Sequence, residues 1–276
     1  GFDNAIEVRQ QRNDDTWDPE DVRYNTFRWI TAEAGFAMGP SRVNPMTGQI
    51  LDADIIFDAS FLRYWKQDYE TFTPADARAL MRAPSPDDSQ PNPFGRPHAH
   101  GPNSHCLLCK GMQQQMGFAA ATLMGRGLTS AKGELPEKFI EQALKEVVMH
   151  EVGHTLGLRH NFKSSTWKTL EQMNDPVKGA AEGTVSSVMD YSPANIAPKG
   201  TKQGLYYSTT IGPYDYWAIE YGYKQVTGDE KKELAKIASR SAEPGLDYAT
   251  DEDTTGASSD PLSNRFDLGK NPIAFS

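Results

Sequence analysis

The sequence predicts an α+β protein in which strands dominate the first 60 residues and helices follow. Segments 22–31 and 49–58 alternate apolar with polar residues and are rich in β-branched or aromatic side chains, which is the pattern of strands with one buried face. Segment 136–156 instead repeats its apolar residues at the spacing of a helix. We therefore expect a sheet packed on a helix, followed by a mainly helical or irregular C-terminal part.

Composition excludes several classes of protein. Of the 276 residues, 38% are hydrophobic and 24% are charged, values that suit a soluble globular fold. No apolar run is long enough to cross a membrane. The net charge of −9 argues against nucleic acid and anionic membrane surfaces as partners. Two cysteines rule out a disulfide-rich scaffold and leave the redox compartment open.

Four extended segments are expected before residue 60. Segments 5–9 and 22–31 alternate as strands do. Segment 34–40 contains two glycines and a proline, so it suits the edge of a sheet better than its centre. Turn residues at 44–48 then reverse the chain into a strand at 49–58, which predicts a hairpin.

The expected helices are 61–83, 111–127, 136–156, 212–222 and 229–240, with a proline-rich loop at 84–102 between the first two. Pro136 suits a first helical turn, and Gly212 with Pro213 starts a later helix that Gly222 ends.

The helix at 136–156 has two apolar stripes on different faces, so we expect it to be buried on two sides. One stripe comprises Ile140, Leu144, Val148 and Val152. The other comprises Ala143, Val147, His150 and His154.

The second half of this helix carries a candidate metal site. His150 and His154 are one helical turn apart, so both imidazoles point from one face and can bind a single ion. Gly157 lets the backbone leave the helix in a left-handed conformation, and this turn brings back His160 as a third ligand. Three neutral nitrogens with one open position are typical of a catalytic zinc site, whereas a structural zinc is closed by four protein ligands.

Glu151 is the candidate catalytic residue of this site. It follows the first ligand, where it does not bind the ion but is placed to take a proton from a metal-activated water. The extended pattern H-E-x-x-H-x-x-G-x-x-H is the signature of the metzincin metallopeptidases, which this chain therefore resembles.

The resemblance to metzincins extends beyond the histidines. Segment 186–191 looks like the Met-turn, which in that clan places a methionine, here Met189, beneath the zinc-bound imidazoles. Tyr191 follows two residues later, as does the tyrosine of astacins and serralysins that can ligate zinc and stabilise the transition state. The alternative is that Tyr191 is a packed aromatic residue near the cleft.

The order of the strands resembles the upper subdomain of matrix metalloproteinases, in which an edge strand pairs antiparallel with the bound peptide. The resemblance implies a twisted mixed sheet with such an edge strand, packed on the active-site helix. It assigns substrate binding here to Phe36, Ala37, Met38 and Gly39. An ordinary capped sheet edge without a ligand is the alternative.

The closest resemblance is to a bacterial family of zinc-dependent metalloproteases with a Met-zincin domain. The segments that carry it are 150–165, 187–191, 214–223 and 260–269. The resemblance implies a secreted or periplasmic protein whose catalytic domain follows N-terminal domains of its own chain. It also implies an upper subdomain at 1–160 and a lower one, with the Met-turn, at 161–276.

The start of the chain departs from the metzincin pattern. Metzincins begin with a strand and a long helix that backs the active-site helix, and we expect both to be missing here. Gly1 to Asp3 show no feature of a signal peptide, and we expect the chain to be a piece of a longer one.

Two groups of side chains could bind further metal ions, but other roles also fit their sequence. The first comprises His98, His100, His105, Cys106 and Cys109, which could bind a second metal, form a disulfide or redox pair, or do neither. The second is the acidic run 251–253, which predicts either a calcium site or a solvated turn.

These features predict a zinc-dependent endopeptidase with Zn²⁺ as cofactor and a peptide or protein as substrate. In this mechanism Glu151 is the general base and His150, His154 and His160 bind the ion. One alternative is a zinc amidase acting on a non-protein amide such as a cell-wall peptide. Another is a non-catalytic binding domain of a larger surface protein.

Overall fold

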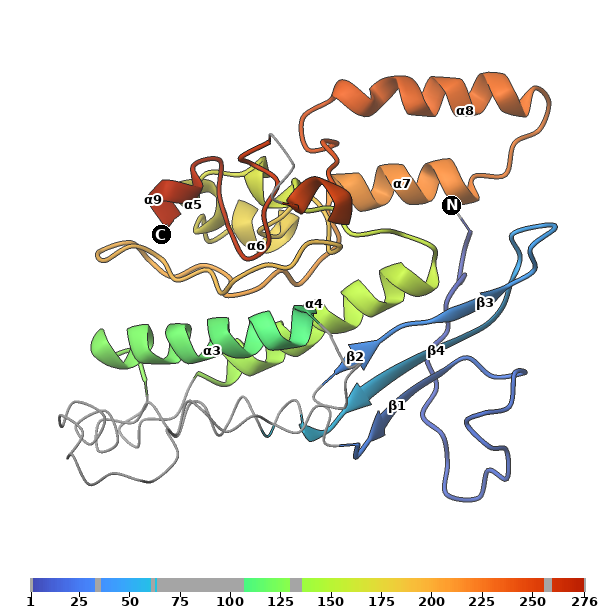
Figure 1. The fold of residues 1–276 in the computed structure, drawn as a ribbon, viewed down its shortest axis with the longest axis horizontal. Helices are drawn as coiled ribbons and strands as arrows, with labels where there is room; N and C mark the ends of the chain where they lie inside the picture. Colours follow the sequence, from blue (N-terminus) through green and yellow to red (C-terminus); the bar gives the residue numbers. More distant parts are fainter. Residues whose placement is uncertain are drawn as a thin grey trace.

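The computed structural model describes residues 2–32, 36–60, 63, 107–129, 136–255 and 260–275, and it has the expected α+β architecture. In Figure 1 helix α4 (Glu137–Thr155) lies between the sheet and the C-terminal part of the chain. The predicted helix at 61–83, the loop at 84–102 and the cluster of His98, His100, His105 and Cys106 lie outside the described residues, as does the side chain of Cys109.

The sheet is mixed and is built around strand β4 (Ile50–Asp58). Strand β1 (Thr26–Ile30) runs parallel to β4, whereas β2 (Ala37–Met38) and β3 (Ser41–Val43) are antiparallel to it. The order β1-β4-β2 leaves β2 at an edge, as the glycines and proline of this segment predicted. The predicted strands at 22–31 and 49–58 are confirmed with shorter bounds.

The hairpin between β3 and β4 is closed by the predicted turn at 44–48. Gly48 has a φ of +72°, and its N–H donates to the carbonyl of Asn44 at 2.8 Å. The N–H of Asn44 donates in turn to the carbonyl of Gln49, also at 2.8 Å. Left-handed backbone at the last turn position is the conformation that glycine adopts without strain.

The predicted strand at 5–9 is wrong. This segment is irregular and exposed, with Val8 91% and Ile6 67% accessible. The side chains of Glu7 and Arg9 pair with each other rather than with a neighbouring strand. Alternation of apolar and polar residues allows a strand, but a strand also needs a partner for its backbone hydrogen bonds.

The other predicted helices within the described residues are confirmed with shifted bounds. They are α3 (Leu107–Gly125), α4, α7 (Pro213–Tyr223) and α8 (Glu230–Ala238). The remaining helical elements are η1 (Ser164–Trp167), α5 (Leu170–Met173), α6 (Lys178–Glu182), η2 (Ser239–Ala242), η3 (Asp251–Thr254) and α9 (Pro272–Phe275). Within the described residues, no helix is both long and apolar enough to cross a bilayer.

One apolar core joins the sheet, α3 and α4. Phe57 of β4, Met116 of α3 and Val147 of α4 are almost completely buried in it. Ala143 and Val147 of the second stripe lie in this core, whereas Ile140 and the rest of the first stripe are partly buried against it. Helix α3 therefore shares this core with α4, and the expected absence of the helix that precedes the sheet in metzincins stays a prediction. The division of the chain at residue 160 stays a prediction.

The polar residues of α4 hold the segment 206–208. The side-chain carbonyl of Gln142 accepts from the backbone N–H of Tyr206 at 2.7 Å. One turn further, the carboxylate of Glu146 accepts from the N–H of Ser208 at 2.7 Å. Burial raises the pKa of Glu146 to about 7, since desolvation disfavours the charged form, and the N–H of Ser208 opposes this only in part.

Glu146→Gln should remove a pH-dependent loss of stability. The folded-state pKa of Glu146 lies above the unfolded value of 4.5, so the folded chain holds a proton there that the unfolded chain releases. The free energy of unfolding is therefore highest below pH 4.5 and falls as the pH rises through about 7. The lost free energy is about 3 kcal/mol, because one pKa unit equals about 1.4 kcal/mol.

Urea unfolding of the metal-free wild type and variant between pH 4.5 and 8 measures this difference. The stability of the wild type relative to the variant should fall by about 3 kcal/mol across this range. A constant difference would show that the pKa of Glu146 is not raised.

Candidate metal centre

Two of the three histidines come from α4 and the third from the turn that follows it. His150 and His154 occupy successive turns of the helix, and His150 and Glu151 are almost completely buried. Gly157 has a φ of +87°, as its position in the motif predicted. The N–H of Leu158 closes the helix end by donating to the carbonyl of Gly153 at 3.0 Å, and the chain then places His160 opposite the helix.

The Nδ1 atom of each histidine contacts an oxygen. His150 is 2.7 Å from the carbonyl of Val188, and His154 is 3.0 Å from the carbonyl of Leu158. His160 is 2.8 Å from a carboxylate oxygen of Asp251. A carbonyl can only accept a hydrogen bond, so Nδ1 carries the proton in the first two rings and the carboxylate favours the same tautomer in the third. All three Nε2 atoms are then left with lone pairs.

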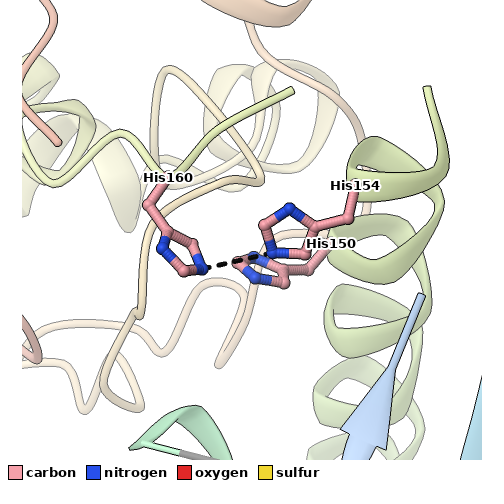
Figure 2. Close-up of side chains that lie close together, drawn as sticks. All are labelled: His150, His154 and His160. Carbon is pink, nitrogen blue, oxygen red and sulfur yellow. Dashed lines mark hydrogen bonds between the residues drawn. The ribbon is translucent and has the colours of Figure 1, made fainter. Parts of the chain in front are cut away.

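The Nε2 atoms converge, as Figure 2 shows. Those of His154 and His160 lie 3.2 Å apart, and the ligand atoms of all three histidines lie within 4.8 Å of one another. Two facing lone pairs repel each other unless a proton or a metal ion lies between them. Two nitrogen ligands of one tetrahedral zinc, each about 2.0–2.1 Å from the ion, lie about 3.3 Å apart, which the observed spacing fits.

The electrostatics keep the imidazoles of His150 and His154 neutral. Burial lowers the pKa of His150 well below its ordinary value, and the nearby rings of His154 and His160 lower it further. Burial likewise lowers the pKa of His154. A metal binds the neutral imidazole, so these two residues are already in the binding form near pH 7.

Met189 lies directly against α4 at the level of the histidines. Its side chain is fully buried, and a Cβ built on Gly153 would lie 2.3 Å from its sulfur. The carbonyl of Met189 accepts from the N–H of Asn161 at 2.9 Å, which joins this turn to the segment after His160. Gly153 is therefore required because the sulfur takes the space that a side chain would occupy.

Two buried carboxylates hold the turn at 186–191. Asp190 accepts from the hydroxyl of Ser164 and from the N–H groups of Ser165 and Tyr191. Asp215, in the first turn of α7, accepts from the N–H groups of Val188 and Gly212 and from the hydroxyl of Ser187. Burial raises the pKa of both Asp190 and Asp215 above the ordinary value.

A chain of hydrogen bonds connects Asp215 to the first histidine. The hydroxyl of Ser187 donates to Asp215 at 2.6 Å and accepts from the N–H of Met189 at 3.0 Å. That N–H belongs to the same peptide group as the Val188 carbonyl to which His150 donates. The orientation of His150 thus depends on a carboxylate of α7 through one hydroxyl and one peptide plane.

A cavity of about 270 Å³ opens beside the histidines. It is lined by Ala37, Met38, Gly39, Pro40, Leu108, His150, Glu151, His154, His160 and Tyr191. The edge strand approaches α4 so closely that a Cβ on Gly39 would lie 2.3 Å from the carbonyl oxygen of Glu151. The hydroxyl of Tyr191 is 2.9 Å from Nε2 of His160.

Most of the residues singled out in the sequence meet at this cavity. Phe36 does not line it, because it packs against the core while its carbonyl accepts from the N–H of Asp58. Met189 packs against Gly153 of α4 and does not line the cavity. Pro40, the last residue of the expected edge segment, also lines the cavity, as does Leu108, which the sequence analysis did not select.

The acidic run 251–253 forms the solvent-accessible turn η3, one of the two alternatives expected, and its side chains also have specific partners. Asp251 contacts His160 and Arg265, Glu252 pairs with Arg159, and Asp253 accepts from the N–H of Thr250. Among the residues that the structure describes, only the three histidines form a group able to hold a metal. Asp251 and His160 are 91 residues apart, and no sequence pattern links them.

Comparison with known families gives one match. Residues 132–276, more than half of the chain, match a family model described as Met-zincin. This match includes the three histidines, Glu151, Met189 and Tyr191. A search of curated proteins and a search of solved structures each found no match.

The structure predicts different costs for alanine at Gly153 and at Gly157. At Gly153 the new Cβ meets the sulfur of Met189, and overpacking of this kind costs about 1–3 kcal/mol. At Gly157 the Cβ meets nothing within 4 Å, so the cost of about 1–2 kcal/mol comes from the positive φ alone.

A double-mutant cycle with Met189→Ala separates the two causes. Truncation of Met189 should rescue Gly153→Ala, with a coupling of about 0.5–3 kcal/mol in urea unfolding. The unfolding free-energy changes caused by this truncation and by Gly157→Ala should be additive to within about 0.5 kcal/mol. Equal coupling at both glycines would contradict the contact.

Proposed function

Because this chain belongs to the Met-zincin family, we propose that it is a zinc-dependent endopeptidase. The observation that carries the proposal is the convergence of three imidazole Nε2 atoms beside Glu151, in a cavity bounded by a sheet edge. His150, His154 and His160 would hold the ion. A bound zinc supplies Lewis-acid chemistry, since it polarises a carbonyl and lowers the pKa of water to about 7.

Glu151 is the general base in this proposal. It follows His150 on α4 and lines the same cavity, so its carboxylate is placed to accept a proton from the attacking water. The same carboxyl group then returns the proton to the leaving amine. No covalent acyl-enzyme is needed, because the water is the nucleophile.

Tyr191 is assigned to the stabilisation of the transition state. Its hydroxyl lies 2.9 Å from Nε2 of His160, at the point where the three histidines converge. Its backbone carbonyl accepts from Phe266, whose ring packs near the tyrosine with centroids 5.8 Å apart. A phenol held at this position can donate a hydrogen bond to an oxygen that becomes negatively charged.

The edge strand β2 is assigned to binding of an extended peptide. Ala37, Met38 and Gly39 line the cavity, and β2 lies at the end of the path β1-β4-β2. A peptide added to a sheet edge is held through its main chain, which gives affinity with little dependence on sequence. The close contact of Gly39 with Glu151 would keep this peptide beside the general base.

Glu151→Gln tests the proposed role of the carboxylate. The variant should bind as much zinc as the wild type, because all three histidines remain. Its kcat on a peptide library, measured by mass spectrometry, should fall by about 100-fold to 10,000-fold, the usual contribution of general acid–base catalysis.

Glu141→Gln is the matched control, because Glu141 is an exposed glutamate on the same helix. It should retain wild-type zinc content and kcat. Retained peptide cleavage in the Glu151 variant would rule out the assignment. Cleavage of cell-wall fragments but not of peptides by the wild type would favour the amidase instead.

A further inference from the structure

The third histidine is held differently from the other two. His150 and His154 are fixed by the helix that carries them, but His160 lies beyond the helix end. Its loop is bound instead by the segment before η3. The N–H of Phe162 donates to the carbonyl of Ala249 at 2.7 Å, and the Asn161 side chain bonds the backbone of residues Asp247 and Ala249.

The first residue of η3, Asp251, is the only charged partner among the three Nδ1 contacts. Asp251 accepts from Nδ1 of His160 at 2.8 Å with one carboxylate oxygen, and its other oxygen is 3.1 Å from the Arg265 guanidinium. The guanidinium also lies 4.7 Å above the ring of Phe162. With both oxygens engaged, the carboxylate has one orientation, and so does the imidazole.

A neighbouring ion pair differs in exposure. Arg159 contacts Glu252 at 2.7 and 2.8 Å, but the two side chains are 57% and 68% exposed. Exposed ion pairs of this kind contribute little to stability. The side chains of His160 and Asp251 are 17% and 42% exposed, so their contact is screened less by water than the Arg159–Glu252 pair.

We propose that Asp251, held by Arg265, is a positioning residue that orients His160 for metal binding. This inference rests on the proposed zinc site and adds to it the residue that sets the strength of the third ligand. The carboxylate keeps the proton on Nδ1, aims Nε2 at the other two histidines and places a negative charge behind the imidazole. Partners of this kind typically change metal affinity by 10–100-fold.

Zinc affinity of the full chain, measured by competition with a chromogenic chelator at fixed pH, tests the proposal. Asp251→Ala should weaken zinc binding by about 10–100-fold. Asp251→Asn should weaken zinc binding less, because the amide oxygen can still accept a hydrogen bond from Nδ1 of His160. Glu252→Gln, the matched control in the same η3 element, should bind zinc within about twofold of the wild type, since its pair is exposed.

A second readout separates orientation of the ligand from general stability. In the cobalt-loaded protein, the d–d absorption band should shift in Asp251→Asn but not in Glu252→Gln, because only the former alters a ligand. The melting temperature of the metal-free Asp251→Asn chain should stay close to that of wild type. If Asp251→Ala does not fold, the asparagine variant decides the question.

Wild-type zinc affinity and an unchanged cobalt spectrum in the Asp251 variants would overturn the proposal. That result is distinct from failure of the proposed peptidase activity. The latter would appear as tight zinc binding by the wild type without peptide cleavage that depends on Glu151.

Discussion

The site depends on the pairing of each histidine Nδ1 with an oxygen acceptor. This pairing leaves three Nε2 lone pairs that face one another, with two of them 3.2 Å apart. The acceptors come from three separate places, namely Leu158 in the turn after α4, Val188 in the turn at 186–191 and Asp251 in η3. The metal centre is therefore complete only when α4 and both of the later segments are in place.

Buried polar groups fix these segments relative to the helix. Asp190 and Asp215 bind the turn at 186–191 from two sides, and Glu146 of α4 holds the segment at 206–208. Buried carboxyl groups cost stability unless they are hydrogen-bonded, and each of these accepts from backbone N–H groups. Asp190 and Asp215 hold the turn whose Val188 carbonyl accepts from His150, so these buried carboxyl groups help to orient that histidine.

The sequence was most informative where the chemistry is local. The spacing of His150 and His154 predicted that their rings share one face, because helical geometry sets this distance. Gly157 predicted the helix end, after which the chain brings back His160. The edge position of β2 followed from its glycines and proline. The irregular segment 5–9 was misjudged, since alternation cannot reveal whether a partner strand exists. Asp251 was not recognised as a partner of His160, because that contact joins residues 91 apart.

X-ray absorption at the zinc edge of the zinc-loaded chain tests the central claim most directly. We predict one zinc per chain with three imidazole nitrogens and oxygen as the remaining ligand, all at about 2.0–2.1 Å. Loss of any one of the three histidines should remove one nitrogen from this shell. An imidazole count that is unchanged by replacement of His160 would contradict the account.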